Sequence, residues 1–289
     1  MTNPGLDEKV VLITGANHGV GAATAKLFAE HGAKVFICSY RGPGNYAVSE
    51  LEQARKSGIG GPLLYEAMQQ LSPDLVVQEI RSRGGQAAFY EADLADAGNV
   101  PLLFDRCEKQ FGPVDILVNN HTHCVLDAFD PALVTDEGFG VHPTVAESID
   151  AHFVVNARAY VLMMAEYLKR YLERDAKRVR IINLSTDAAH AHVKAVSYAA
   201  SKHAIESHSR SAAAELGKYG ITVNIVAPGP IQTGYIRPEE ETDIALKTPL
   251  GRVGKPEDVA EVIVFLASER AHWLTGQLLY VGGRWRMHQ

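Results

Sequence analysis

Short, almost uniformly apolar runs alternate with helix-forming segments along the whole chain. We expect strands at Val10–Thr14, Val35–Ser39, Ala87–Glu91, Ile116–Asn119, Val179–Leu184, Thr222–Val226 and Gln277–Val281. Helical periodicity predicts helices at Gly21–His31, Val100–Phe111, Val145–Arg174, Tyr198–Tyr219 and Pro256–Ala267. Strands that are apolar on both faces and separated by helices predict a parallel sheet covered on both sides. No Pro/Gly/Ser-rich linker divides the pattern, so the sequence predicts one α/β domain over residues 1–289, a doubly wound parallel sheet of the Rossmann type.

Two segments are longer than this plan requires, at about residues 42–85 and 121–144. Within the first, Val48–Lys56 and Leu63–Arg83 both look helical, with an interruption near Pro73. Long loops in compact domains are usually functional or disordered. Surface elaboration, subunit contact and shaping of a substrate entrance all stay open for these two insertions.

Charge and cysteine content limit the classes of partner. The formal net charge is −6 and no Lys/Arg run occurs, which argues against a nucleic-acid partner. The polar N-terminus does not resemble a signal peptide, and no apolar stretch approaches the ~20 residues of a membrane span. Cys38, Cys107 and Cys124 form no C-x-x-C pair, as expected in a reducing compartment. We therefore expect a soluble cytoplasmic protein that does not contact membranes.

A glycine-rich turn, Thr14–Gly21, joins the first strand to the first helix. Glycines let the backbone approach a pyrophosphate, and the helix N-terminus supplies unpaired N–H groups and a positive dipole end. The turn predicts a dinucleotide site whose candidate contacts are Gly15, Asn17, His18, Gly19, Val20 and Gly21.

A tyrosine and a lysine stand four positions apart in a predicted helix, as Tyr198 and Lys202. That spacing places both side chains on one helix face. At ~4 Å and an effective dielectric of ~20, an ammonium stabilises a phenolate by about 4 kcal/mol, or about three pKa units. Such a phenol can act as a general acid or base near neutral pH. Ser185 follows a strand, thirteen positions before Tyr198, at the edge where open α/β sheets bind ligands.

With these residues in view, the chain resembles the short-chain dehydrogenase/reductase family, and in particular its 3-oxoacyl reductase-like members, over nearly its whole length. The motifs that carry the resemblance are Thr14–Gly21, Asp93-Leu94, Asn119-Asn120, the set Asn156, Ser185, Tyr198 and Lys202, and Pro228–Thr233. The resemblance implies an oxidoreductase that transfers a hydride between a nicotinamide cofactor and the carbonyl or secondary alcohol of a small molecule.

The resemblance also implies a role for each matching residue. Tyr198 is expected to be the acid/base, Lys202 to lower the pKa of Tyr198 and hold the ribose, Ser185 to bind the substrate oxygen and Asn156 to hold a relay water. The further expected cofactor contacts are Asp93 at the adenine, Leu94, Asn119, Pro228, Gly229, and Ile231 with Thr233 at the carboxamide. For Asn156 and Asp93, a purely local backbone hydrogen bond is the alternative.

Two positions depart from the family pattern. His121-Thr122 stands where the family usually has Ala-Gly, so the bulkier His121 puts the local geometry in question. The run Val281-Gly282-Gly283-Arg284 lacks the usual aspartate, a change expected to affect packing or assembly.

Cofactor preference depends on the end of the second strand, which reads Ser39-Tyr40-Arg41. NAD-specific sites use an acidic residue there for the ribose 2′-hydroxyl, and none is present. Arg41 can pair with a 2′-phosphate, and His18 occupies a position where NADP-preferring relatives often carry a basic residue. The sequence favours NADP(H), with NAD(H) possible.

Histidines occur in two groups, His121 and His123 with Cys124, and His190 with His192. Their spacing matches no usual zinc pattern, so we expect no metal site. His190, His192 and Asp187 are expected either to line the substrate pocket or to face solvent.

Substrate choice is expected to depend on residues 234–250, a lid that carries Glu239, Glu240, Glu241 and Asp243. An acidic rim disfavours an acidic carrier protein, so a free small molecule is preferred over an acyl thioester of carrier protein or CoA. A catalytically silent protein that binds the cofactor as a sensor or scaffold is the alternative to an enzyme.

The resemblance also implies a homodimer or homotetramer that uses Val145–Arg174 and Tyr198–Tyr219 as two-fold surfaces.

Overall fold

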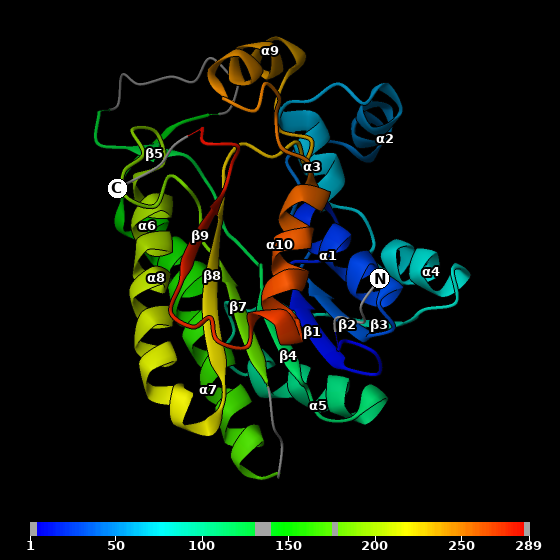
Figure 1. The fold of residues 1–289 in the computed structure, drawn as a ribbon. Helices are drawn as coiled ribbons and strands as arrows, with labels where there is room; N and C mark the ends of the chain where they lie inside the picture. The colour runs from blue at the N-terminus through cyan, green and yellow to red at the C-terminus, as the bar shows by residue number, and fades with distance from the viewer. Residues whose placement is uncertain (1–4, 131–139, 175–178, 286–289) are drawn as a thin grey trace.

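Seven parallel strands form the central sheet of the computed structural model, which describes residues 5–130, 140–174 and 179–285. Their order is β3-β2-β1-β4-β7-β8-β9 (Figure 1). The bounds are β1 Val10–Thr14, β2 Lys34–Ser39, β3 Gln86–Glu91, β4 Ile116–Asn119, β7 Arg180–Leu184, β8 Thr222–Pro228 and β9 Leu278–Val281. The prediction of a doubly wound parallel sheet in one domain is confirmed.

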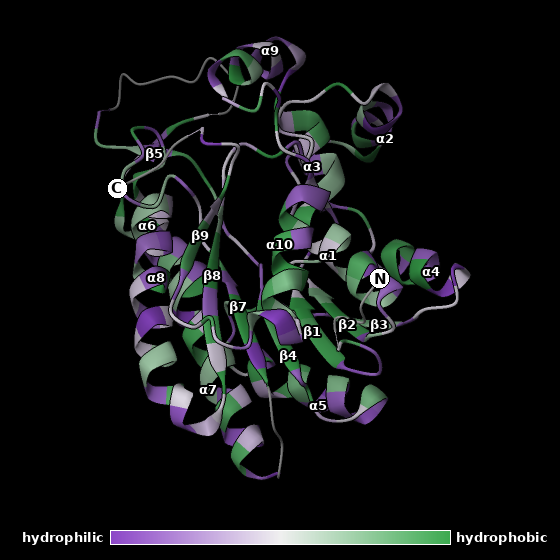
Figure 2. Cartoon of the chain, viewed as in Figure 1, coloured by the Kyte–Doolittle hydropathy of each residue, from purple (hydrophilic) through white to green (hydrophobic). Residues whose placement is uncertain are grey.

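Helices cover both faces of the sheet (Figure 1). One face packs against α1 (Gly19–Glu30), α4 (Pro73–Ser82) and α10 (Pro256–Ala267). The other packs against α5 (Asn99–Phe111), α7 (Ala159–Leu172) and α8 (Val196–Leu216). In β1, Val11 and Ile13 enter the first core, whereas Val10 and Leu12 enter the second. Both faces of β1 are therefore apolar, and β1 is mostly green, the colour of hydrophobic residues, in Figure 2.

The predicted helix Val145–Arg174 is interrupted in the structure. It comprises α6 (Ala146–Phe153), a π-helical turn η1 (Val154–Arg158) and α7. Asn156 lies fully buried in the π turn and hydrogen-bonds the loop after β4. Single π turns inside α-helices are frequent at functional sites. The remaining short elements are β5 (Asp127–Ala128), β6 (His142–Pro143), η2 (Gly217–Tyr219), α9 (Pro238–Lys247) and η3 (Glu269–Ala271).

The predicted insertion at 42–85 contains α2 (Val48–Ser57) and α3 (Pro62–Gln69), followed by the crossover helix α4. α2 and α3 share a small core of their own, made by Leu51, Ala54, Leu64 and Ala67. The buried carboxylate of Glu66 accepts hydrogen bonds from Asn45 N at 2.7 Å and from Tyr46 N at 3.1 Å. We call residues 42–71 the α2–α3 insertion.

The α2–α3 insertion is attached to two segments at the carboxyl end of the sheet. Asn17 Nδ2, in the glycine-rich turn, donates to the carbonyls of Gln69 at 2.7 Å and Leu71 at 2.9 Å. Gly61 N donates to Gly234 O at 2.9 Å, at the start of the predicted lid. Figure 1 shows α2, α3 and α9 at this same end. These contacts support the alternative in which the insertion shapes a binding cleft.

The second insertion, 121–144, is described only in part, because residues 131–139 lie outside the described ranges. Among the helices of the described ranges, none is both long and apolar enough to cross a membrane.

The anchoring role of Glu66 gives the first prediction. Glu66→Ala removes the carboxylate that accepts from the backbone N–H groups of residues 45 and 46, and a hydrogen bond to a charged group contributes about 1.5–3 kcal/mol. We expect faster limited proteolysis within residues 42–71, with cleavage sites identified by mass spectrometry. Glu52→Ala, an exposed position on α2, is the matched control. Equal cleavage rates in the two variants would contradict the anchoring role.

Candidate active site

A cleft of about 930 Å³ opens at the carboxyl ends of the strands, between the glycine-rich turn and the α2–α3 insertion. Ten of the predicted cofactor contacts line it, namely Gly15, Asn17, His18, Gly19, Val20, Ser39, Tyr40, Asp93, Leu94 and Thr233. A cleft of this volume suits a cofactor.

The glycine-rich turn fits a phosphate group. Gly15 has φ +63°, and a Cβ there would lie 2.8 Å from His121 Cα. A Cβ on Gly21 would lie 2.2 Å from Gly15 O, so Gly21 serves the close approach of α1 to the turn. α1 begins at Gly19 and directs its N-terminal N–H groups toward the cleft. The turn would hold the pyrophosphate of a dinucleotide.

Asn119 was expected to contact the cofactor, but it is not among the residues that line the cleft. Asn119 is fully buried, and its Nδ2 donates to Asn183 Oδ1 at 2.8 Å between β4 and β7. The next residue, Asn120, lines the cleft and donates through Nδ2 to Gly15 O at 2.7 Å. Asn120 therefore fixes the glycine-rich turn, a role that the sequence analysis did not assign.

Pro228, Gly229 and Ile231 form the turn behind Thr233 and are not among the lining residues described for the cleft. Pro228 O accepts from Asp187 N at 3.0 Å, and Ile231 forms a β-bridge with Gly254. This turn presents the Thr233 side chain to the cleft, where it lies against Gly19.

Tyr198 shares a side-chain hydrogen bond with Thr186, not with Ser185. Ser185 Oγ is buried and points toward α8, where it donates to Glu206 Oε1 at 2.7 Å. Ser185 N still bonds Val226 O at 2.8 Å, so the extended backbone continues past β7. Successive side chains of extended backbone point to opposite faces. The Ser185 hydroxyl therefore points toward Glu206, and the Thr186 hydroxyl lies on the side of Tyr198, which the motif spacing did not indicate.

Lys202 is directed at Tyr160 and at the backbone of β7. Its Nζ donates to Leu184 O at 3.0 Å and to Tyr160 Oη at 3.2 Å. Burial lowers the pKa of Lys202 to about 7. The lowering of the Tyr198 pKa by Lys202 stays a prediction, since Lys202 Nζ is directed at other groups here. Burial, together with nearby Cys124 and Tyr65, raises the pKa of Tyr198 well above its ordinary value.

The side chain of Asn156 is fully engaged by protein groups. Oδ1 accepts from His123 N at 2.7 Å and from Thr122 Oγ1 at 3.2 Å. Nδ2 donates to His123 O at 2.8 Å and to Ser201 Oγ at 3.0 Å. The amide thus joins the segment after β4 to α8, which favours the local structural alternative over a side-chain contact to a relay water.

His121 is accommodated by Tyr160, which explains how the bulky residue fits. The two rings pack with centroids 4.3 Å apart, and Tyr160 Oη donates to His121 O at 2.8 Å. His121 Nδ1 lies 2.7 Å from Thr14 Oγ1. Burial, reinforced by the charge of Lys202, lowers the pKa of His121 to about 3, so the imidazole is neutral at physiological pH.

The residues proposed to recognise a 2′-phosphate differ in their placement. Arg41 lies outside the described lining of the cleft, and its Nε and Nη2 donate to the two Glu91 carboxylate oxygens at 2.6 and 2.8 Å. Burial lowers the pKa of His18 to about 4, so this ring carries no charge at neutral pH. Ser39 Oγ, at the cleft, is buried and has no hydrogen-bond partner within the described residues.

Tyr65 of α3 brings an aromatic ring from the insertion into the cleft. Its ring centroid lies 6.3 Å from that of His18 and 5.9 Å from that of Tyr235, both in edge-to-face geometry. Tyr65 is close enough to Tyr198 to contribute to the raised pKa of that phenol. Sequence reasoning gave no signal for Tyr65, because its approach depends on how the insertion folds back. Asp187, His190 and His192 are not among the described lining residues.

Comparison with known proteins identifies the family of this chain. The family model for enoyl-(acyl carrier protein) reductase matches residues 60–283, and that for short chain dehydrogenase matches residues 9–72. A probable tetrahydroxynaphthalene reductase of Zymoseptoria tritici is 33% identical over 96% of this chain and 94% of its own. An NADPH-dependent aldehyde reductase-like protein, chloroplastic, of Arabidopsis thaliana is 31% identical over 95% and 93%, respectively.

A crystal structure of a dehydrogenase/reductase from Sinorhizobium meliloti superimposes with a TM-score of 0.76 at 26% identity, covering 99% of this chain and 98% of that one. The chain therefore belongs to the short-chain dehydrogenase/reductase family, whose members are oxidoreductases that bind a nicotinamide cofactor.

Burial of Lys202 makes stability depend on pH. Its pKa is about 7 in the folded chain, against an ordinary 10.5, so between these values the unfolded chain binds more protons at this residue. Stability contributed by Lys202 therefore rises with pH across that window. We expect the unfolding free energy of wild type minus that of Lys202→Met to rise by roughly 1 kcal/mol per pH unit from about pH 7.5 to 9.5, measured in urea. A difference in unfolding free energy that does not change with pH would contradict the lowered pKa of Lys202.

Proposed function

We propose that this protein is an NADP(H)-preferring carbonyl reductase in which Tyr198 transfers the proton to or from the substrate oxygen. The observation that carries the proposal is the hydrogen bond between Tyr198 and Thr186 beside a cleft lined by the glycine-rich turn. The residues present fit a dinucleotide, since the turn, Ser39 and Thr233 together supply its expected contacts.

Tyr198 holds its proton at neutral pH. A phenol whose pKa is raised well above 10 is protonated at neutral pH, and it can give its proton to a carbonyl oxygen as charge develops there. When bound, the nicotinamide supplies the hydride that reaches the carbonyl carbon, so that ketone, hydride and proton give the alcohol. Thr186 would donate a second hydrogen bond to the same oxygen.

Lys202 would restore the proton after turnover. Its pKa of about 7 lets the ammonium exchange protons near neutral pH, and it contacts Tyr160, whose proximity contributes to the Tyr198 pKa. We propose that Lys202 also holds the cofactor ribose, although it is directed at Leu184 O and Tyr160 here. Asn156 would position α8, and with it Tyr198, through Ser201.

Three substitutions separate these roles. Tyr198→Phe should reduce kcat more than about a hundredfold and change cofactor affinity only a few-fold, because the ring remains and the proton is lost. Thr186→Val should reduce kcat by about 10²- to 10³-fold, as expected for an oxyanion donor. Ser185→Ala, the matched control, should have a much smaller effect. If Ser185→Ala is the more damaging of the two hydroxyl variants, the assignment of Thr186 is wrong.

The cofactor preference rests on the end of β2. The Ser39 hydroxyl, which has no hydrogen-bond partner in the part of the chain that the structure describes, leaves room for a phosphate oxygen where NAD-specific sites place a carboxylate. Arg41 is exposed and adjacent, so its guanidinium can turn from Glu91 toward a 2′-phosphate. The name of the NADPH-dependent relative from Arabidopsis thaliana is consistent with this choice.

Paired variants test the preference. Arg41→Ala should weaken NADPH binding roughly ten- to a hundredfold, because a charge-assisted hydrogen bond is worth ~1.5–3 kcal/mol. Glu91→Gln, which releases Arg41, should strengthen NADPH binding. Neither change should alter NADH affinity, measured by fluorescence titration. Equal effects on both cofactors, or a wild type that prefers NADH, would refute the proposal.

A planar aromatic or conjugated ketone is the proposed substrate class. The Tyr65 ring lies in the cleft near Tyr198 and packs edge-to-face against His18 and Tyr235, so it offers an aromatic contact for a substrate. The Zymoseptoria tritici relative is named for a polycyclic aromatic substrate. Glu239, Glu240 and Glu241 in the first turn of α9, part of the proposed lid 234–250, disfavour an acidic acyl carrier. The homodimer or homotetramer expected through Val145–Arg174 and Tyr198–Tyr219 remains part of the proposal.

Tyr65 can be tested for its part in substrate choice. Tyr65→Ala should raise KM for a naphthalene-type ketone about tenfold, through lost ring contacts, and leave KM for a small aliphatic ketone nearly unchanged. Tyr65→Phe retains the ring and should behave like wild type. The loss of activity toward both ketones equally would assign Tyr65 a structural role.

A further inference from the structure

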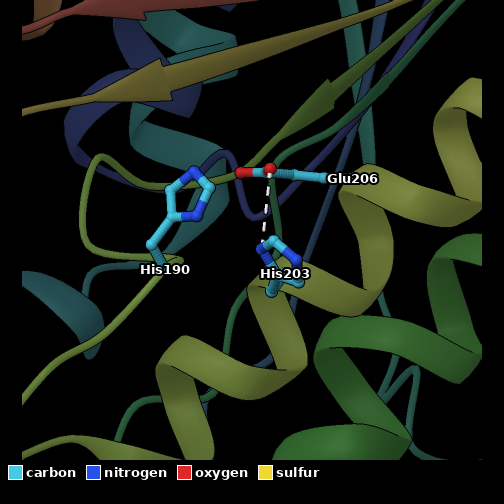
Figure 3. Close-up of side chains that lie close together, drawn as sticks. All are labelled: His190, His203 and Glu206. Atoms are coloured by element: carbon cyan, nitrogen blue, oxygen red, sulfur yellow. Dashed lines mark ion pairs between the residues drawn. The ribbon is translucent and has the colours of Figure 1, made fainter. Parts of the chain in front are cut away.

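A second group of reactive side chains lies outside the cleft, on α8 and the segment after β7. His203 and Glu206 stand three residues apart on α8, and His190 approaches them from the segment that follows β7 (Figure 3). One ligand atom of each lies within 4.8 Å of the others. From the sequence alone, His190 groups with His192 and no metal site is expected, because sequence spacing does not show that these two segments lie together in the fold.

The carboxylate of Glu206 is the unusual member of this group. Only 1% of its surface is exposed, and Oε1 accepts the Ser185 hydroxyl at 2.7 Å. Oε2 is buried with no hydrogen-bond partner among the described residues. Arg210 Nη2 lies 3.7 Å from Oε2, and the His203 Nδ1 atom lies 3.9 Å from it. A buried carboxylate oxygen without a hydrogen bond is costly unless a cation or donor satisfies it.

We propose that His190, His203 and Glu206 bind a divalent transition-metal ion of the zinc class. Two imidazoles and one carboxylate are a ligand set that zinc accepts, with a further position left for water. Ligand bonds of about 2 Å require the three atoms to approach one another by roughly 1 Å. Both histidines are exposed side chains that can rotate by this amount. The Tyr280 hydroxyl lies 3.4 Å from His190 Nε2, a second contact of the kind that orients a ligating imidazole.

Such an ion would connect two parts of the proposed active site without taking part in the reaction. Ser185 and Thr186 precede His190 in one segment, and Tyr198 and Lys202 share α8 with His203 and Glu206. The ion would hold the segment and the helix together beside the Ser185–Glu206 hydrogen bond. The site is therefore a structural clamp on the segment that carries Thr186.

Arg210 is the competitor for this site. Its guanidinium approaches Glu206 Oε2 from the next turn of α8 and is about half exposed, so it can move into solvent. A metal ion and Arg210 would compete for the same oxygen. Removing the arginine charge should therefore strengthen metal binding, an effect that non-specific binding to surface histidines would not show.

The test uses the full-length protein after chelator treatment and measures binding of ZnCl2 by isothermal titration calorimetry. We expect one zinc ion per chain, weaker binding by at least tenfold in His203→Ala and in Glu206→Gln, and tighter binding in Arg210→Gln. Glu206→Gln keeps an acceptor for Ser185, and His203→Ala alters an exposed side chain, so both should fold. His208→Ala, an exposed histidine on the same helix, is the control and should bind zinc as wild type does.

The same variants show what would overturn the proposal. Absence of zinc binding to wild type, or equal binding by wild type and His203→Ala, refutes the site. A zinc-dependent rise in melting temperature in wild type and His208→Ala, absent in His203→Ala, supports the clamp. These measurements involve no turnover, so their failure leaves the proposed reductase activity untouched.

Discussion

Burial of both faces of a parallel sheet determines where this protein can place polar chemistry. Each face is sealed by three helices, and the strands carry apolar side chains toward both. Polar side chains that must reach a ligand are consequently confined to the carboxyl edge, where the strands end and the helices begin. The glycine-rich turn, Asn120, Thr186 and Thr233 all lie just beyond strand ends at this edge. The α2–α3 insertion then closes the cleft from outside the sheet.

His121, which replaces the small residue usual in the family, belongs to a buried polar network with Tyr160 and Lys202. Tyr160 contacts the His121 ring and backbone and also accepts a hydrogen bond from Lys202. An ammonium deprived of water loses protons more easily, which explains a lysine pKa near 7. The neutral imidazole of His121 adds no second charge. His121 and Tyr160 therefore form a matched pair, and the histidine is compatible with the site because the tyrosine fills the space beside it.

Periodic features were predictable from the sequence, and features that depend on distant partners were not. Apolar runs located every strand of the sheet to within about two residues, and the ranges of β1, β4 and α10 agree fully. The choice between Ser185 and Thr186 depended on one residue of strand register, and that between Asn119 and Asn120 on which side chain faces β7. Arg41 pairs with a glutamate fifty positions away, and Tyr65 reaches the cleft only through the folding of an insertion. Motif spacing indicates neither the Arg41–Glu91 ion pair nor the position of Tyr65 in the cleft.

A crystal structure with NADP(H) and a non-reducible ketone analogue would measure the central geometry directly. The account predicts that the analogue's oxygen lies about 3 Å from both Tyr198 Oη and Thr186 Oγ1. The Ser185 hydroxyl should stay on Glu206, as it is here. An analogue oxygen bound by Ser185, or one placed away from Tyr198, would contradict the account.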